Sequence, residues 1–266
     1  MNNVIKSGFL LINKPTGISS YGCINHIKRI LRQKNQGPHS ENRGPHAKNS
    51  GAGSKEWGYK IGHAGTLDPF ASGLLIVALG REATRLIARF MVMEKTYIAT
   101  GKCGELTDTL DYTGTVMATT DVIPSEQEIK EALDSFGSSY EQIPPLYSAL
   151  KHQGKPLYLL ARKKMINQEQ LQEISTAKRR IVQLYEKQFL SYDFPFFTIQ
   201  VRVSHGTYIR TLINDIAVRA GSYATTYQLI RTAIGPFSLS DAVNLSSLNT
   251  IDDVNAHIIP FDMIVL

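Results

Sequence analysis

A single carboxylate, Asp68, lies in a turn-rich stretch that reads KIGHAGTLDPFASGLLIVALG over residues 60–80. Gly62, Gly65 and Pro69 mark its polar part as a loop, because glycine permits positive φ and proline fixes φ. The run LLIVAL that follows predicts a buried strand or a short core helix, and periodicity alone does not separate the two. A lone carboxylate tethered to such a rigid element suits nucleophilic or general-base catalysis, provided that it stays ionised.

The stretch SHGTYIRTL offers a cation that could keep such a carboxylate ionised. An arginine beside an aspartate lowers the pKa of the aspartate by roughly one to three pH units. We expect Tyr208 and Arg210 to lie on a strand, two residues apart and therefore on one face, where an aromatic ring and a fixed cation suit a nucleobase stacked beside a carboxylate. Taken singly, Asp68 reads equally as a turn former, Tyr208 as core and Arg210 as surface. These residues alone therefore leave the function open.

Several other chemistries lack their sequence signatures. The chain contains no GxGxxG, GxxxxGK[ST], HExxH, CxxC or GxSxG motif, so nucleotide-phosphate loops, a built-in catalytic metal and a serine nucleophile elbow are unsupported. Two distant cysteines, Cys23 and Cys103, form neither a disulfide framework nor a zinc pattern. The chain has neither a signal-peptide apolar segment nor a run of about 18 apolar residues. We therefore expect a cytoplasmic protein with no membrane association.

Positive charge is concentrated near the N-terminus. The net charge is +6, but residues 1–60 hold ten lysines or arginines against two glutamates, whereas the remainder is slightly acidic. Such asymmetry suits a polyanion or an acidic membrane surface, and equally a solvated basic face.

Hydrophobic periodicity predicts an α+β fold, because strands and helices alternate without a regular βαβ pattern. We expect a strand over 9–12, a helix capped by Ser19 or Ser20, a helix over 82–91, a strand around Tyr97, and a helix with a Ser125–Glu128 capping box. Further strands precede a helix that ends at Gly221, and ATTYQLIRTAIGPFSLSDAV predicts helix, turn and edge strand.

Residues 33–59 differ in kind from their surroundings. They contain no Val, Ile, Leu, Phe or Met, and are rich in Gly, Pro, Asn, Ser, Lys and His. Such a segment buries too little apolar surface to order itself, which predicts a mobile insertion within a folded domain.

Five blocks in fixed order together carry a family resemblance: GFLLINKPTGISS, GHAGTLDPFASGLLIVALGREATRL, KTYIATGKCGELTDTLDYTG, QIPPLYSALKHQGKPLY and VSHGTYIRTLINDIA. In these blocks the chain closely resembles the bacterial TruB-type tRNA pseudouridine synthases, from about Gly8 to Ala242. The resemblance implies the pseudouridine synthase fold, with a central mixed, mostly antiparallel twisted sheet flanked by helices. It also implies isomerisation of the T-loop uridine of tRNA, at position 55, without cofactor or metal.

The resemblance assigns roles to individual residues. Asp68 corresponds to the catalytic aspartate, which attacks the ribose C1′ or the ring C6, and the sequence does not choose between these routes. Tyr97 corresponds to the tyrosine that stacks on the flipped uridine, Arg210 to the arginine paired with the aspartate, and Tyr208 to a pocket aromatic. The remaining matches are His63, which enters the T-loop where the base has left, Lys14 with Pro15, which support the active-site loop, and Asp108 in the substrate region.

An enzyme of this class must take its base out of the stack. Flipping costs a few kcal/mol, aromatic stacking returns roughly 1–3 kcal/mol per base, and phosphate contacts supply further affinity. Residues 142–180 lie where the family has its RNA-gripping thumb. Within this segment we expect phosphate contacts from Lys151, Lys155, Arg179 and Arg180.

The chain departs from many relatives at its C-terminal end. We expect a catalytic domain over 1–245 and a tail over 246–266 that is too short for a PUA RNA-binding domain, with tRNA as the partner through its T-arm, a monomeric state and no obligate protein partner. The basic insertion over 33–59 is expected to compensate partly for the missing domain. Two alternatives stay open: a tRNA-folding chaperone with secondary or no catalysis, and a synthase that acts on other RNAs.

Overall fold

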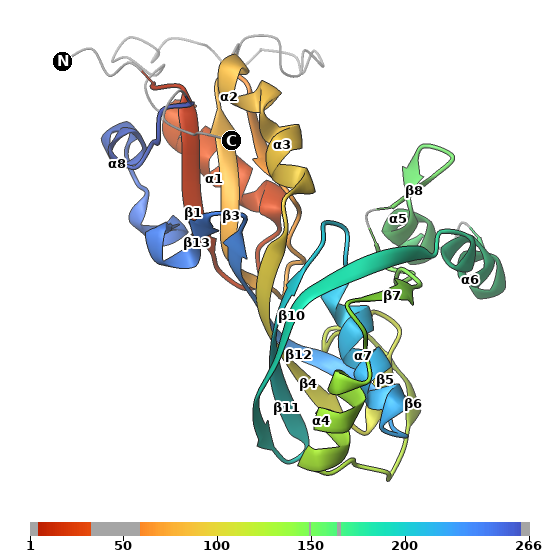
Figure 1. The fold of residues 1–266 in the computed structure, drawn as a ribbon. Helices are drawn as coiled ribbons and strands as arrows, with labels where there is room; N and C mark the ends of the chain where they lie inside the picture. The colour runs from red at the N-terminus through yellow and green to blue at the C-terminus, as the bar shows by residue number, and fades with distance from the viewer. Residues whose placement is uncertain (1–4, 33–58, 149, 164–165, 262–266) are drawn as a thin grey trace, which may run out of the picture. The chain divides into compact units, whose positions relative to one another are not determined.

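The computed structural model describes residues 5–32, 59–148, 150–163 and 166–261 (Figure 1). The predicted insertion over 33–59 lies almost entirely outside these residues. The chain divides into two compact units, one formed by residues 1–92 with 236–266 and the other by residues 93–235. The first unit is therefore built from both ends of the chain.

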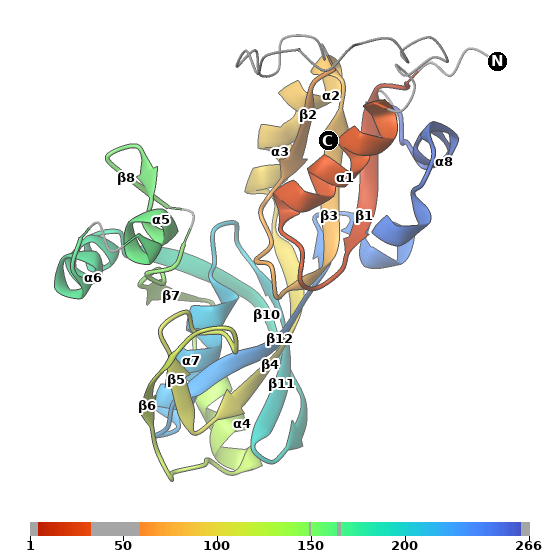
Figure 2. The ribbon, with the colours of Figure 1, turned by 180° about the vertical axis from the view of Figure 1, so that it is seen from behind.

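In the first unit, helices cover both faces of the sheet. Its strands follow the order β14-β1-β3-β2, in which β1 runs parallel to β14 and antiparallel to β3. Figure 2 shows α1 crossing one face of β1 and β3. The elements are β1 (Gly8–Lys14), α1 (Ser20–Arg32), β2 (Ile61–Ala64), β3 (Ser72–Leu79), α2 (Arg81–Arg85), α3 (Ile87–Val92), β13 (Phe237–Ser238), β14 (Val243–Asn244) and α8 (Ile251–Ala256).

Burial on both faces explains why two of these strands read as continuous apolar runs. Leu10 points into a cluster beneath α1, and its neighbour Phe9 faces the other way, where its ring lies 4.7 Å from that of Phe90 in α3. A strand covered on both faces needs apolar residues at every position. The run LLIVAL is accordingly β3, which resolves the choice between strand and helix.

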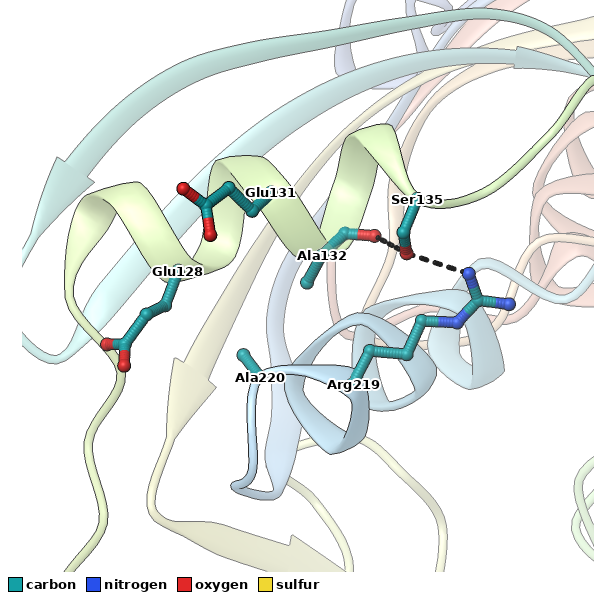
Figure 3. A pocket seen from close by; sticks show the side chains of 6 residues that line it. All are labelled: Glu128, Glu131, Ala132, Ser135, Arg219 and Ala220. Atoms are coloured by element: carbon teal, nitrogen blue, oxygen red, sulfur yellow. Dashed lines mark hydrogen bonds between the residues drawn. The ribbon is translucent and has the colours of Figure 1, made fainter.

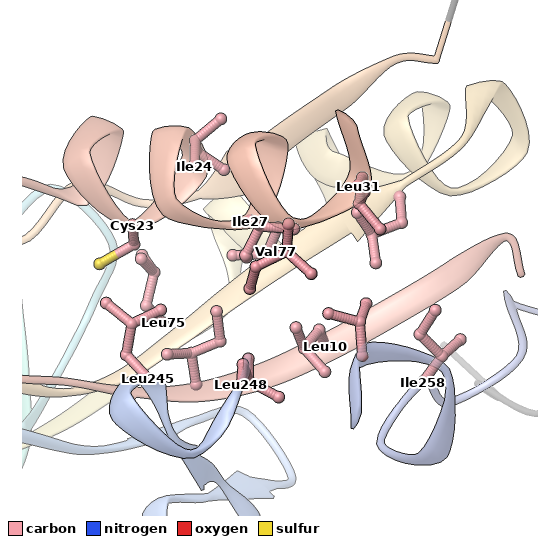
Figure 4. Packing of buried hydrophobic residues seen from close by; sticks show 14 of the residues in the cluster. Leu10, Cys23, Ile24, Ile27, Leu31, Leu75, Val77, Leu245, Leu248 and Ile258 are labelled. Atoms are coloured by element: carbon pink, nitrogen blue, oxygen red, sulfur yellow. The ribbon is translucent and has the colours of Figure 1, made fainter. Parts of the chain in front are cut away.

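The cluster beneath α1 joins distant parts of the chain (Figure 4). Apolar side chains of α1 recur at the predicted helical spacing and pack against β1 and β3. The predicted tail contributes to the same cluster through Leu248, Ile251, Val254 and Ile258, beside Leu245. Residues 246–261 are therefore part of the core of the first unit.

In the second unit, the strands of the sheet are antiparallel and follow the order β12-β4-β11-β10-β7. Helix α7 packs on β12 and β4, and α4 packs on β10 and α7. The elements are β4 (Lys95–Cys103), β5 (Glu105–Thr107), β6 (Val116–Thr119), α4 (Glu126–Asp134), β7 (Ser139–Gln142), β8 (Lys151–His152), β9 (Lys155–Pro156), α5 (Leu157–Arg162), α6 (Gln168–Ala177), β10 (Arg180–Asp193), β11 (Phe196–Val203), α7 (Ile209–Arg219) and β12 (Ala224–Ile234).

Local signals predicted several boundaries correctly. The Ser125–Glu128 capping box begins α4, where Ser125 Oγ accepts from the Glu128 amide and the Glu128 carboxylate accepts from the Ser125 amide. Ser19 Oγ accepts from the Gly22 amide at the start of α1. The α+β class and the mostly antiparallel sheet are confirmed.

Two local predictions were wrong. The segment predicted as helix, turn and edge strand begins instead with an 11-residue strand, β12, that pairs along β4. Tyr208 and Arg210 do not share a strand either, because β11 ends at Val203 and Tyr208 is the residue just before α7. The β-branched residues of β12 outweigh its weak helical periodicity once a partner strand is available.

Candidate active site

The loop that carries Asp68 is held by a buried lysine from β1. Lys14 is fully buried, and its Nζ donates to the carbonyl oxygens of Pro15 at 2.9 Å, Ile18 at 2.6 Å and Pro69 at 3.3 Å. Buried ammonium groups are costly unless they are hydrogen-bonded, and carbonyls from two loops meet that need here. Lys14 thus links the NKPTG turn to the residue that follows Asp68, and these contacts are what its predicted supporting role requires.

A serine holds the other side of the same loop. Ser20 Oγ, at the start of α1, accepts from the Leu67 amide at 2.8 Å and donates to the Leu67 carbonyl at 3.1 Å. The Gly17 amide donates to the Pro69 carbonyl at 2.8 Å. The backbone is therefore fixed immediately before and after Asp68, whose side chain stays partly exposed. Such a carboxylate can reach a ligand without the loop having to reorganise.

His63 lies on β2, opposite Val77 of β3, and its side chain is partly buried. Four residues separate it from Asp68, and both belong to the first unit. Its predicted entry into the T-loop stays a prediction.

Tyr97 lies on β4 in the second unit, with only 9% of its surface exposed. Its neighbours in the sheet are Val201 of β11 and Arg231 of β12. Lys95 lies on the same face of β4 as Tyr97. Burial, with Arg231 nearby, lowers the pKa of Lys95 to about 8. Sequence reasoning singled out neither Lys95 nor Arg231, because a charged residue in a strand pattern is usually exposed.

Arg210 is enclosed by oxygen atoms from two segments of the chain. It is 4% exposed, and its guanidinium donates to the Thr109 carbonyl, to the Tyr147 carbonyl at 3.0 Å and to the Asp111 carboxylate at 3.4 Å. The second carboxylate oxygen of Asp111 accepts from the amide of Thr113 at 3.0 Å and from its hydroxyl at 2.5 Å. The arginine is thereby fixed in one orientation.

Asp111 is the charged partner that sequence reasoning missed. The same LTDTLDYTG turn holds Asp108, which was predicted for the substrate region. Asp108 accepts from the Thr115 amide at 2.8 Å within the turn and also hydrogen-bonds the Tyr147 hydroxyl, and its place in the substrate region stays a prediction. A turn with two aspartates gives no sequence signal for which one faces inward.

Tyr208 lies beside a cation of the predicted thumb. The guanidinium of Arg180 sits over its ring, 5.0 Å from the centroid. In this geometry a cation is attracted by the ring quadrupole. Tyr208, Arg210, Tyr97 and Asp108 belong to the second unit and Asp68 to the first. The pairing of Asp68 with Arg210 therefore stays a prediction.

The predicted thumb has its own small apolar cluster, in which Leu157 and Leu160 of α5 meet Leu171 of α6. Its hairpin, β8–β9, carries Lys151 and Lys155, both exposed. Arg179 is exposed as well and lies 3.8 Å from Glu141. An exposed pair of this kind contributes little stability, so Arg179 is available to another anion.

A pocket lies where α4 and α7 face each other (Figure 3). It is lined by Glu128, Glu131, Ala132, Ser135, Arg219 and Ala220. Arg219 donates to Ser135 Oγ at 2.8 Å and covers the ring of Phe136. None of the predicted site residues lines this pocket.

Cys23 and Cys103 are free and buried, which agrees with the absence of a disulfide framework in the sequence. No helix within the described ranges is both long and apolar enough to cross a membrane.

Comparison with known structures identifies the fold class. One relative, from the crystal structure of a Cbf5–Nop10–Gar1 complex, aligns with a TM-score of 0.62 and 27% identity, covering 93% of this chain and 54% of that one. A second, from an H/ACA RNP bound to a substrate RNA containing 2′-deoxyuridine, aligns with a TM-score of 0.62 at 23% identity, over 97% of this chain and 60% of the other. The present chain thus spans little more than half of these solved chains.

Comparison with known sequences identifies the family. Residues 54–209 match the N-terminal domain of the TruB family pseudouridylate synthases. The chain is 34% identical to tRNA pseudouridine synthase B of Protochlamydia amoebophila, over 96% of this chain and 84% of that protein. It is 41% identical to the protein of the same name from Desulfotalea psychrophila, over 89% and 85%. The chain belongs to the TruB family of pseudouridylate synthases.

Proposed function

We propose that this protein is a tRNA pseudouridine synthase that isomerises the T-loop uridine at position 55. The observation that carries the proposal is the fixed loop around Asp68, which presents a partly exposed carboxylate between two anchored backbone segments. Its relatives at 34–41% identity bear the name tRNA pseudouridine synthase B. The substrate in this proposal is tRNA, bound through its T-arm by a cytoplasmic monomer.

In the proposed reaction Asp68 is the nucleophile. Its carboxylate either displaces N1 from the ribose C1′ of the flipped uridine, so that the glycosidic bond breaks as the new bond forms, or adds first to the ring C6, after which the bond between N1 and C1′ breaks. The detached base turns, C5 bonds to C1′, Asp68 departs, and the proton on C5 is lost as N1 gains one. Tyr97 stacks on the base and takes part in moving the C5 proton, and Arg210 keeps the carboxylate ionised.

Binding is proposed to rest on His63, which takes the vacated place in the T-loop, on Tyr208 and Asp108 beside the base, and on the basic thumb over 142–180. Fixed phosphate contacts from Lys151, Lys155, Arg179 and Arg180 suit an A-form stem, which proteins recognise largely by its shape and backbone.

Tritium release tests the proposal, because the C5 hydrogen leaves only if isomerisation occurs. Unmodified tRNA carrying C5-tritiated uridine is incubated with wild type and with Asp68→Asn, and binding of the same tRNA is measured in parallel. We expect release by wild type alone and binding by both proteins. Binding of tRNA by wild type without tritium release would contradict the proposal and favour the alternative function as a tRNA-folding chaperone. Release from RNAs other than tRNA would favour the wider substrate range.

A further inference from the structure

Gln142 is a fully buried polar residue at the end of β7, where it opens the QIPPLYSALK stretch. Its backbone pairs with Arg180 of β10. A buried amide normally has its donors and acceptor satisfied, so its partners indicate what it is built to hold.

Both backbone groups of Tyr208 are bonded to this one side chain. The Tyr208 amide donates to Gln142 Oε1 at 2.8 Å, and Gln142 Nε2 donates to the Tyr208 carbonyl at 3.0 Å. The side-chain amide thus pairs with the Tyr208 backbone as a neighbouring strand would, at a point where β11 has already ended. It fixes the residue from which α7 begins.

The orientation of the amide is set by a second hydrogen bond. Gln142 Nε2 also donates to the Tyr140 hydroxyl, and that hydroxyl is hydrogen-bonded to the carboxylate of Asp215 in α7. Burial raises the pKa of Asp215 to about 6, so above that pH its carboxylate is ionised and can only accept; Tyr140 then donates to Asp215 and accepts from the amide. Asp215, Tyr140 and Gln142 therefore form a directed chain that ends on the Tyr208 backbone.

Two predicted site residues depend on this point of the backbone. The Tyr208 ring lies beneath Arg180, whose backbone pairs with Gln142 itself. Arg210 follows two residues later, in the first turn of α7, where it contacts Asp111 and the Thr109 and Tyr147 carbonyls. A shift of Tyr208 would therefore displace the aromatic ring and the start of the helix that carries the cation.

We propose that Gln142 is a positioning residue for pseudouridine formation, which fixes the Tyr208 backbone and thereby the Tyr208 ring and the Arg210 guanidinium. This inference rests on the proposed function. Small displacements of groups that must meet a reacting atom lower the rate of the chemical step more than they weaken binding of a large substrate.

Gln142→Glu tests the inference with almost no change in shape. At pH 8 the ionised carboxylate accepts from the Tyr208 amide but cannot donate to its carbonyl, so we expect the single-turnover rate constant for tritium release to fall roughly ten- to a hundredfold. The dissociation constant for tRNA is expected to stay within about threefold, because the phosphate contacts are unchanged. Gln183→Glu is the matched control, because it makes the same change at an exposed side chain on the neighbouring strand β10. It should leave the rate constant unchanged.

The pH dependence of the rate constant distinguishes a positioning role of Gln142 from a merely structural one. Protonation of the carboxylate introduced by Gln142→Glu restores a donor toward the Tyr208 carbonyl, and burial beside Tyr140 and Asp215 favours that neutral form. The ratio of the variant rate constant to that of wild type is therefore expected to rise severalfold between pH 8 and pH 6. With enzyme in saturating excess, a partly unfolded population does not alter this rate constant.

The outcomes separate the inference from the proposed function. No release by wild type contradicts the proposed function itself. Release by wild type with an unchanged rate constant in Gln142→Glu, or a deficit that does not shrink at pH 6, overturns the inference alone. If Gln142→Glu does not fold, Tyr140→Phe decides: it removes only the hydroxyl that orients the amide, and we expect a three- to tenfold lower rate constant with tRNA binding retained. An unchanged rate constant in Tyr140→Phe would also overturn the inference.

Discussion

At the scale of single residues, the environment of Arg210 shows how a buried cation is held in one orientation. Its guanidinium donates to two backbone carbonyls and to Asp111, in a surrounding that excludes water. A fully ordered guanidinium needs no reorganisation when a second carboxylate approaches. This preorganisation is what electrostatic catalysis requires.

Asp111→Asn tests that environment. The substitution keeps the size of the side chain but removes the charge beside Arg210, so the guanidinium loses its charged partner. We expect unfolding free energy to fall by about 2 kcal/mol and the single-turnover rate constant by about tenfold or more. Thermal unfolding and tritium release measure the two effects.

Asp108→Asn is the control within the same turn. Asp108 is more exposed and accepts from a backbone amide of the turn rather than from Arg210. We expect its loss to cost less stability than that of Asp111. Equal losses from both variants would argue against a special role for the buried pair.

At the scale of elements, the errors and successes of sequence reasoning share a cause. Helix caps and loops are determined by residues that are close together in the sequence, so the start of α4 and the loop around Asp68 could be predicted. The strand β12 could not, because its conformation depends on a partner, β4, that lies more than a hundred residues earlier. Tyr208 was misplaced because nothing in SHGTYIRTL shows that β11 ends before it.

The packing of α7 leads to a prediction on pH. Burial raises the pKa of Asp215 in α7 to about 6, whereas an unfolded aspartate titrates near 3.9. The folded state therefore holds this proton more tightly, and its stabilising contribution is lost as pH rises from about 4 through 6. Asparagine does not titrate. The unfolding free energy of Asp215→Asn, relative to wild type, is thus expected to rise by on the order of 2 kcal/mol between pH 4 and pH 7.

Urea unfolding at a series of pH values provides the measurement. Asp193→Asn, at an exposed carboxylate of β10, serves as the control for a change of net charge. A constant difference between wild type and Asp215→Asn across this window would show that the carboxyl group is not buried as described.

At the scale of the whole molecule, the blocks that carry the family resemblance lie in both units, and they include the strands β1 and β3 of the first unit's core. Sequence reasoning selected Asp68, Tyr97 and Arg210 as site residues through those blocks, and these assignments stay predictions. It did not foresee that residues after Ala242 complete the first unit. In that segment single apolar residues are spaced among polar ones, and such a pattern matches no family motif. Only packing against α1 and β1 reveals their role.

Leu248→Ala tests whether this C-terminal segment belongs to the core. Leu248 is fully buried in the cluster with α1, β1 and β3, and its backbone carbonyl accepts a hydrogen bond from His26 of α1. Truncating a buried leucine leaves a cavity, and we expect unfolding free energy to fall by about 2–5 kcal/mol. Ser247→Ala, at the exposed neighbour, should change it by less than about 0.5 kcal/mol. A cost below about 1 kcal/mol for Leu248→Ala would mean that residues 246–261 are an appendage, and the first unit would then owe its stability to α1 and the sheet alone.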